Sequence, residues 1–205
     1  MKTRTKALLL ALCAVLLVVT TVFTTLAYMT SITNEVTNTF TVGNVSITLD
    51  EAKVKTDGNY ETNATNRTDK NTYHLIPNTT YIKDPTVHVL SGSENAYLFA
   101  RVTVGADIAA ILDNFALNAT WQKVDGYKDL YVYIGDNAGA DEAVVGDYVL
   151  FNNIKIAASA TNKQLEDAAD DNITVKAYAV QAAGVDPTAS DVISDAATKL
   201  GATAG

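Results

Sequence analysis

The stretch "YLFARVTV", residues 97–104, decides the fold class because aliphatic side chains alternate in it, without interruption, with aromatic or polar ones. In an extended chain, one face carries Leu98, Ala100, Val102 and Val104, and the other carries Tyr97, Phe99, Arg101 and Thr103. A period of two residues predicts a β-strand with one face in the core. A second such stretch, "NITVKAYAVQA" at 172–182, has an inner face made of Ile173, Val175, Ala177 and Ala179.

Shorter alternating stretches surround these two, and polar turns separate them. About eight strands are expected, with connections of very unequal length. The pattern predicts an all-β fold, namely a jelly-roll-like antiparallel β-sandwich with a few short peripheral helices and an N-terminal signal helix. Helical periodicity occurs at 106–116, with Asp107 as a possible cap, and at 186–201, where Gly201 can end the helix.

The N-terminus has the pattern of a secretory signal. Three cations among the first six residues precede the apolar run "ALLLALCAVLLVVTTVFTTLA", residues 7–27. Thr25 and Ala27 suit the −3 and −1 cleavage positions, so the mature chain is expected to begin at Tyr28. The alternative is an uncleaved anchor, because the run is long enough to span a bilayer.

Charge and cysteine content exclude several classes of function. The formal net charge of the 205-residue chain is −8, and removal of residues 1–27 changes it to −11. This balance opposes binding to nucleic acid or to anionic membrane surfaces, so membrane contact is expected only through the signal before cleavage. The single cysteine, Cys13, lies in the signal, and the exported chain therefore has no disulfide and no thiol nucleophile.

Residues able to bind metal are few. His74 and His88 are the only histidines, and Asp84 and Glu94 could in principle complete a zinc site with them. A surface or half-buried histidine is the ordinary interpretation. The acidic stretches "DKNTYH", "DNAGADE" and "EDAADD" lack the twelve-residue register of an EF-hand. We therefore assign no catalytic residue, no metal ligand and no cofactor, and expect a protein that is not an enzyme.

A break in the alternation follows the signal, in "TNTFTVGNVSITLDEAKV" at residues 37–54. Phe40 and Val42 fall on even positions, whereas the apolar residues after Gly43-Asn44 fall on odd positions. One interpretation is a β-bulge within a single strand. The other is a joint between an extension and the domain that follows. The expected organisation is a signal peptide at 1–27, an extension at 28–43, a β-sandwich at 44–186, and a C-terminal helix and tail at 187–205.

Three segments resemble the camelysin/TasA family of exported bacterial matrix proteins, whose signal peptide is processed by a dedicated SipW-type signal peptidase. They are "NTFTVGNVSITLDE" behind the signal, "YHLIPNTTYIKDPTVHVLSGSENAYLFARV", and "VKAYAVQA" near the end. Together they cover roughly a third of the chain, in the order and spacing of the family. Asn78 is a departure, because relatives commonly carry glycine after the proline.

The resemblance implies a jelly-roll β-sandwich that polymerises outside the cell by donor-strand complementation. In this arrangement the N-terminal extension of one subunit adds a strand to the sheet of the next. Residues 28–43 would be the donor strand, Phe40 and Val42 would dock into the neighbour, and Gly43-Asn44 would be the joint, since glycine tolerates unusual backbone angles.

The sequence thus predicts a secreted structural subunit of extracellular fibres or biofilm matrix, located in the matrix or at the cell surface. The expected partners are further copies of the chain in a homopolymer, other matrix proteins, and the signal peptidase during export. Two alternatives stay open. Camelysin has been classed as a metallopeptidase, although no zinc-peptidase motif is present here. The chain could also be a monomeric adhesin or accessory matrix protein.

Overall fold

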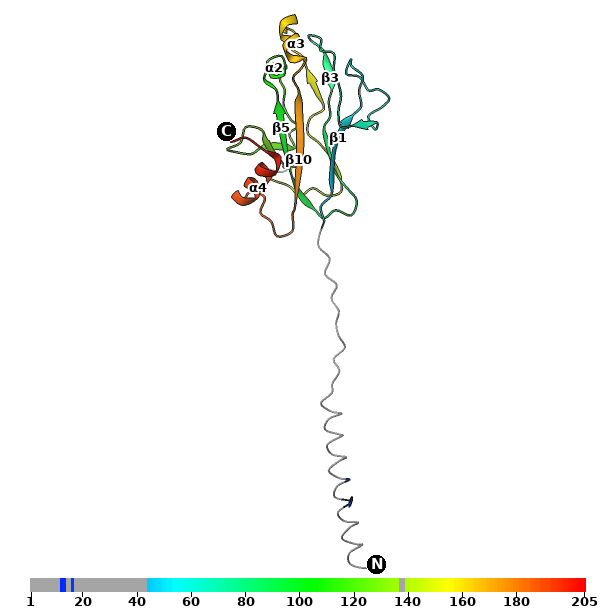
Figure 1. The fold of residues 1–205 in the computed structure, drawn as a ribbon, viewed down its shortest axis with the longest axis vertical. Coiled ribbons are helices and arrows are strands. Elements are labelled where there is room, and N and C mark those ends of the chain that lie inside the picture. Colours follow the sequence, from blue (N-terminus) through cyan, green and yellow to red (C-terminus); the bar gives the residue numbers. More distant parts are fainter. Residues whose placement is uncertain (1–11, 14–15, 17–43, 137–138) are drawn as a thin grey trace, which may run out of the picture. The chain divides into compact units, whose positions relative to one another are not determined.

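The structure is a computed structural model that describes Leu12, Cys13, Leu16 and residues 44–136 and 139–205. The chain divides into two units, 1–41 and 42–205, and the fold is that of the second. Antiparallel strands dominate it and its helices are short, which confirms the predicted all-β class (Figure 1). No helix among the described residues has both the length and the apolar character needed to cross a membrane.

Residues 44–136 and 139–205 form ten strands and three helices. The strands are β1 (Ile47–Ala52), β2 (Arg67–Thr68), β3 (Thr80–Ile82), β4 (Thr86–Val89), β5 (Ala96–Val104), β6 (Trp121–Lys123), β7 (Leu130–Tyr133), β8 (Gly146–Val149), β9 (Asn153–Lys155) and β10 (Ile173–Gln181). The helices are α2 (Ala106–Ala109), α3 (Asn162–Ala168) and α4 (Ser190–Leu200). Strand β4 begins directly after Pro85, which has no N–H group to donate to a ladder.

The strands form two four-stranded sheets, ordered β2-β1-β4-β8 and β10-β5-β7-β6, and a separate pair, β3-β9. Every pairing is antiparallel. One cluster of buried side chains includes residues from both larger sheets, such as Val87 in β4 and Leu98 in β5. The alternation predicted for β5 and β10 is confirmed, because their predicted inner residues all lie in or against this cluster.

Strand β5 is buried on both faces, and α4 is the reason. Phe99 points away from the main cluster into a second one, where it meets Leu130 and the apolar stripe of α4. Buried residues of that stripe are Ala196, Ala197 and Leu200. Gly201 ends α4 with a positive φ of 68°, as predicted.

Helix α2 differs from its prediction. It covers only the start of 106–116, and Asp107 does not cap it, because the helix begins after Gly105. The carboxylate of Asp171 takes that role and accepts hydrogen bonds from the backbone N–H groups of Asp107 (2.9 Å) and Ile108 (3.2 Å). A Cβ atom on Gly105 would lie 1.6 Å from Asp171 Oδ1, so a side chain there would displace the carboxylate from its capping position.

Asn78 has a left-handed backbone with φ of 57°. Its N–H donates to the carbonyl of Ile156 at 3.0 Å, so the turn is held in place. Asparagine is one of the few residues other than glycine that adopt this conformation readily. Asn78 therefore has a backbone geometry that glycine would also supply.

The C-terminal residues are attached to the turn between β6 and β7 through Asp129. This buried carboxylate accepts hydrogen bonds from Arg101 Nε (2.5 Å) and the backbone N–H of Thr203 (3.0 Å). Burial alone raises the pKa of Asp129, but the bonds from Thr203 and Arg101 outweigh it and hold the pKa below its ordinary value. The carboxylate thus stabilises the folded state at neutral pH, and this contribution is lost as the pH falls through the lowered pKa.

We expect Asp129→Asn to lower the free energy of unfolding at neutral pH by about 2–3 kcal/mol, because it removes a charged hydrogen-bond acceptor from a buried site. Urea denaturation followed by circular dichroism measures the change. Asp125→Asn is the matched control in the same turn, because Asp125 is exposed, and it should change the free energy by less than about 0.5 kcal/mol. Equal effects of the two variants would contradict this role of Asp129.

Candidate functional site

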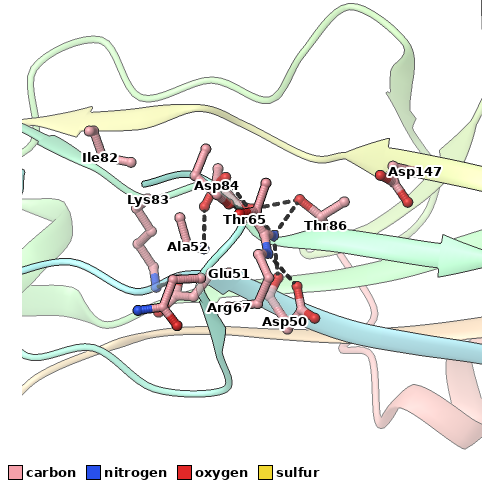
Figure 2. Close-up of polar contacts among 12 residues, drawn as sticks. Asp50, Glu51, Ala52, Thr65, Arg67, Ile82, Lys83, Asp84, Thr86 and Asp147 are labelled. Carbon is pink, nitrogen blue, oxygen red and sulfur yellow. Dashed lines mark hydrogen bonds and ion pairs between the residues drawn. The ribbon is translucent and has the colours of Figure 1, made fainter. Parts of the chain in front are cut away.

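A network of charged side chains centres on Arg67, which belongs to no motif of the sequence. Its Nε donates to Asp50 Oδ1 (2.7 Å), Nη1 to Asp84 Oδ2 (2.7 Å) and Nη2 to Thr86 Oγ1 (2.8 Å), as Figure 2 shows. Nη2 also donates to the carbonyls of Asp50 and Asp84, both at 3.2 Å. The planar guanidinium therefore links β2, the end of β1 and the start of β4 with geometry that a lysine cannot reproduce.

A second ion pair lies beside Arg67. Lys83 Nζ is 2.7 Å from Glu51 Oε2, and these side chains are only 11% and 8% exposed. Asn71 Nδ2 donates to Glu51 Oε1 at 2.9 Å and to the carbonyl of Ala52 at 2.8 Å. The polar segment 55–72 is therefore attached to β1 through Asn71, near the C-terminal end of the segment.

His88 lies in β4 between carboxylates from the two neighbouring strands. Its Nε2 is 2.9 Å from Asp50 Oδ1 in β1, and its Nδ1 is 2.6 Å from Asp147 Oδ1 in β8. Burial alone lowers the pKa of His88, but the hydrogen bonds and charges of Asp50 and Asp147 outweigh burial and raise it above its ordinary value. A protonated His88 can donate to both carboxylates at once, so it links three strands across the sheet.

The predicted candidates for a metal site do not come together. Asp84 binds Arg67, and the backbone of Glu94 lies at a turn where its N–H donates to the carbonyl of Asn44. No group of three or more histidine, cysteine, aspartate or glutamate side chains in the described part of the chain could hold a metal ion. The charged network has the character of a structural support for β1, β4 and β8, because its basic groups are each paired with carboxylates.

A cleft of about 820 Å³ opens between the segment 70–77 and the start of β10. Apolar side chains contribute on both sides, including Tyr73 and Leu75 from the segment and Leu165 and Ile173 from α3 and β10. The segment 70–77 is extended and alternates in exposure, with Tyr73 and Leu75 half-buried and the residues between them exposed, yet it belongs to no sheet. Polar and charged side chains, such as Lys70 and Glu166, line the cleft as well, so its lining is mixed.

Strand β10 has an edge without a ladder among the described residues, and the cleft reaches this strand at its first residue, Ile173. It pairs with β5 through all nine of its residues, and its other edge has no ladder partner among residues 44–136 and 139–205. The bonds from Gly105 N to Asn172 O and from Ala182 N to Asn95 O set the phase of the ladder. Even-numbered residues of β10 therefore bond to β5, and the N–H and C=O groups of the odd-numbered residues point to the open edge.

Most residues predicted to act in signal cleavage or assembly lie outside the described part of the chain: Thr25, Ala27, Tyr28, Phe40, Val42 and Gly43. Asn44 is described, and it is exposed. Its carbonyl accepts a hydrogen bond from Glu94 N at 3.0 Å, and Ser46 N donates to Ser93 Oγ at 3.0 Å. The second residue of the predicted joint is therefore fixed to the turn before β5.

We expect His88→Gln to destabilise the protein more at low pH than at high pH. Because the folded-state pKa of His88 is raised, its contribution is complete below the unfolded value near 6.5 and is lost as the pH rises through the folded value. The loss should be about 1–2 kcal/mol near pH 5.5 and smaller near pH 8.5, measured by urea denaturation. His74→Gln is the control, since His74 is exposed, and a pH-independent loss for His88→Gln would contradict the charged state.

No protein-family model matches the chain, and neither does any curated protein or solved structure. The resemblance carried by the three sequence motifs therefore stays an expectation. Function has to be inferred from the contacts and open surfaces of the described residues.

Proposed function

We propose that the protein is a secreted structural subunit of extracellular fibres or biofilm matrix, and that its copies join head to tail by donor-strand complementation. The donor is the segment 28–43, and the acceptor is the open edge of β10 with the neighbouring cleft. The observation that carries the proposal is the unpaired backbone edge of a nine-residue strand, which has a cleft of mixed polar and apolar lining at its first residue. An extended peptide can satisfy such an edge with main-chain hydrogen bonds and place alternate side chains in the cleft.

The strand connections support a jelly-roll-like β-sandwich for the folded unit. Along the chain, β1 and β4 belong to one sheet, β5 to β7 belong to the other, β8 returns to the first and β10 to the second. Such repeated changes of sheet are typical of double-sheet folds with Greek-key connections. The outer strands of the two sheets are β2 and β8 in one and β10 and β6 in the other, and β10 is the longest of them.

The donor segment has the composition that the acceptor requires. Phe40 and Val42 alternate with threonines, so an extended chain would direct both side chains to one face. Apolar residues of the cleft include Ile108, Leu165 and Ile173, which can cover such side chains. The odd-numbered residues of β10 supply the backbone donors and acceptors.

The geometry also favours exchange between copies. Asn44 is bonded to Glu94, next to the start of β5, whereas the cleft includes Ile173, which pairs with Val104 at the end of β5. Nine residues of strand separate the two places by about 27–30 Å. A donor that leaves one copy at the first place and enters the next copy at the second produces a heterologous contact, which repeats into an open filament.

We expect deletion of residues 28–42 from the secreted form to abolish fibres, because the donor strand is removed. Electron microscopy of the purified protein measures this outcome. The folded unit keeps all the contacts described above, so circular dichroism should still show a β-rich protein that unfolds cooperatively. Fibres formed by the deleted chain would contradict donor-strand assembly.

Ala177→Pro should block assembly and leave the subunit folded. The N–H of Ala177 points to the open edge, so proline removes a donor for the incoming strand and none for β5. Lys176→Pro is the matched control, since its N–H belongs to the ladder with β5, and we expect it to lower stability by about 3 kcal/mol or more. Sedimentation and thermal melting distinguish the variants, and normal fibre growth by Ala177→Pro would exclude β10 as the acceptor.

A further inference from the structure

The proposed donor segment has an apolar face and a polar face along its whole length. In "YMTSITNEVTNTFTVG", residues 28–43, every large apolar residue except Met29 has an even number. In an extended chain the even-numbered residues share one face, and its apolar members are Tyr28, Ile32, Val36, Phe40 and Val42. The odd-numbered face is mostly serine and threonine. It also carries Glu35, the only charged residue of the segment.

Strand β10 likewise has two different faces. Its odd-numbered residues, such as Val175, pack against the main core but stay half-buried. On the outer face Thr174 and Lys176 are exposed, whereas Tyr178 and Val180 belong to the second cluster with the stripe of α4. Figure 1 shows α3 at one end of β10 and α4 nearer the other end. Lys176 is the one charged residue that β10 presents on its outer face.

The charge of Lys176 is not balanced by a partner. Its ammonium group has no ion pair within the described residues, and the residue opposite it in the β5 ladder is another cation, Arg101. Like charges directly opposite each other destabilise a sheet. Asp129 is bonded to Arg101, and the carboxylate of Asp195 accepts a hydrogen bond from the hydroxyl of Tyr178. A carboxylate on the open side of β10 would therefore complement Lys176.

We propose that the donor strand runs antiparallel to β10, with Glu35 of one copy directly opposite Lys176 of the next. This inference rests on the proposed donor exchange and adds its direction and register. Directly opposite residues of two paired strands point to the same face of the sheet, and both residues belong to the polar face of their own strand. The backbone groups of the even-numbered donor residues then meet those of the odd-numbered residues of β10.

The register fits the length and the apolar residues of β10. Residues 30–38 of the donor lie opposite the nine residues of the strand, which leaves no part of its open edge unpaired. Val36 lies opposite Val175, and Ile32 lies opposite Ala179. These side chains cover the inner face of β10, which is only half-buried in the subunit alone.

The cleft decides the direction of the donor. In the antiparallel register Phe40 lies two residues beyond the partner of Ile173, so its side chain enters the cleft beside Leu165. A parallel donor with the same ion pair would place Phe40 opposite Gln181, at the other end of β10 from the cleft. The antiparallel direction therefore places the largest apolar side chain near the joint in the space available for it.

The ion pair decides the register. A shift by one residue would turn the apolar face of the donor to the outside. A shift by two residues in one direction moves Glu35 opposite Tyr178, whose hydroxyl is bonded to the carboxylate of Asp195. The same shift in the other direction moves Glu35 opposite Thr174. Only the proposed register sets the acid of the donor directly opposite the cation of β10.

Paired cysteines test the direction. A secreted form that begins at Tyr28 contains no cysteine, because Cys13 precedes it. In the proposed register Thr37 lies directly opposite Thr174, at a Cα separation that suits a disulfide. We expect fibres of the chain with Thr37→Cys and Thr174→Cys, assembled under reducing conditions and then oxidised with diamide, to give a ladder of covalent multimers on a non-reducing gel.

The matched control carries Thr33→Cys and Thr174→Cys. In the antiparallel register these two positions are four residues apart along the strands, about 13 Å, which is too far for a disulfide. In a parallel arrangement with Glu35 opposite Lys176 they would be directly opposite. Covalent multimers of the control chain, or fibres of the first chain that stay uncrosslinked, overturn the proposal.

Charge reversal tests the ion pair separately. Glu35→Lys or Lys176→Glu alone places like charges opposite each other, so we expect the critical concentration for fibre growth to rise about three- to fivefold at low ionic strength. The chain with both changes restores the attraction and should assemble nearly as the unmodified chain does. The chain with Glu35→Lys and Lys123→Glu has the same net charge, with its second change at an exposed position in β6, and should keep the defect. Failure of Lys176→Glu to rescue Glu35→Lys overturns the pairing.

The deletion of residues 28–42 separates the failure of this inference from the failure of donor exchange. Pelleting and electron microscopy measure assembly in every variant. If the deleted chain still forms fibres, donor exchange is wrong and the register is wrong with it. If the deletion abolishes fibres while the crosslink and the rescue both fail, donor exchange is supported and this register alone is wrong.

Discussion

Backbone hydrogen bonds between β5 and β10 connect the main parts of the folded unit. The ladder places the inner residues of both strands against the main core, and it presents Phe99 to the second cluster under α4. It also leaves the other edge of β10 without a ladder among the described residues. Because burial on both faces fixes β5, the free edge of β10 is held in a defined position, which an acceptor of an incoming strand requires.

The two sheets differ in how side chains cover the backbone groups at their edges. At the end of β1, the side chains of Arg67, Asn71 and Asp84 bind backbone groups of Asp50 and Ala52, and the short strand β2 adds to the pairing. No comparable side-chain contacts occur along the odd-numbered groups of β10 within the described residues. Edges of sheets are usually protected against unwanted pairing, so an edge without such protection is consistent with a surface kept for assembly.

Local periodicity predicted the strands and helices whose burial is set by their own sequence. Two kinds of pattern were sufficient to predict these elements, namely the alternation in β5 and β10 and the apolar stripe of α4. Each pattern indicates an element that buries one face in the core. The site around Arg67 could not be predicted in this way, since its partners lie 17 to 19 residues away and no spacing rule connects them. The prediction for helix α2 was wrong for the same reason, because the residue that caps it, Asp171, lies on a distant segment of the chain. The open edge of β10 follows only from the pairing of the strands.

The cap of α2 bears on the order in which the chain can fold. A helix of four residues is too short to persist alone, and the carboxylate that satisfies its first N–H groups belongs to a residue 64 positions later. Gly105 leaves space for that carboxylate and, by its own flexibility, makes early formation of the helix still less favourable. We therefore expect helix α2 to form late, after the chain has closed the long loop that brings Asp171 to it.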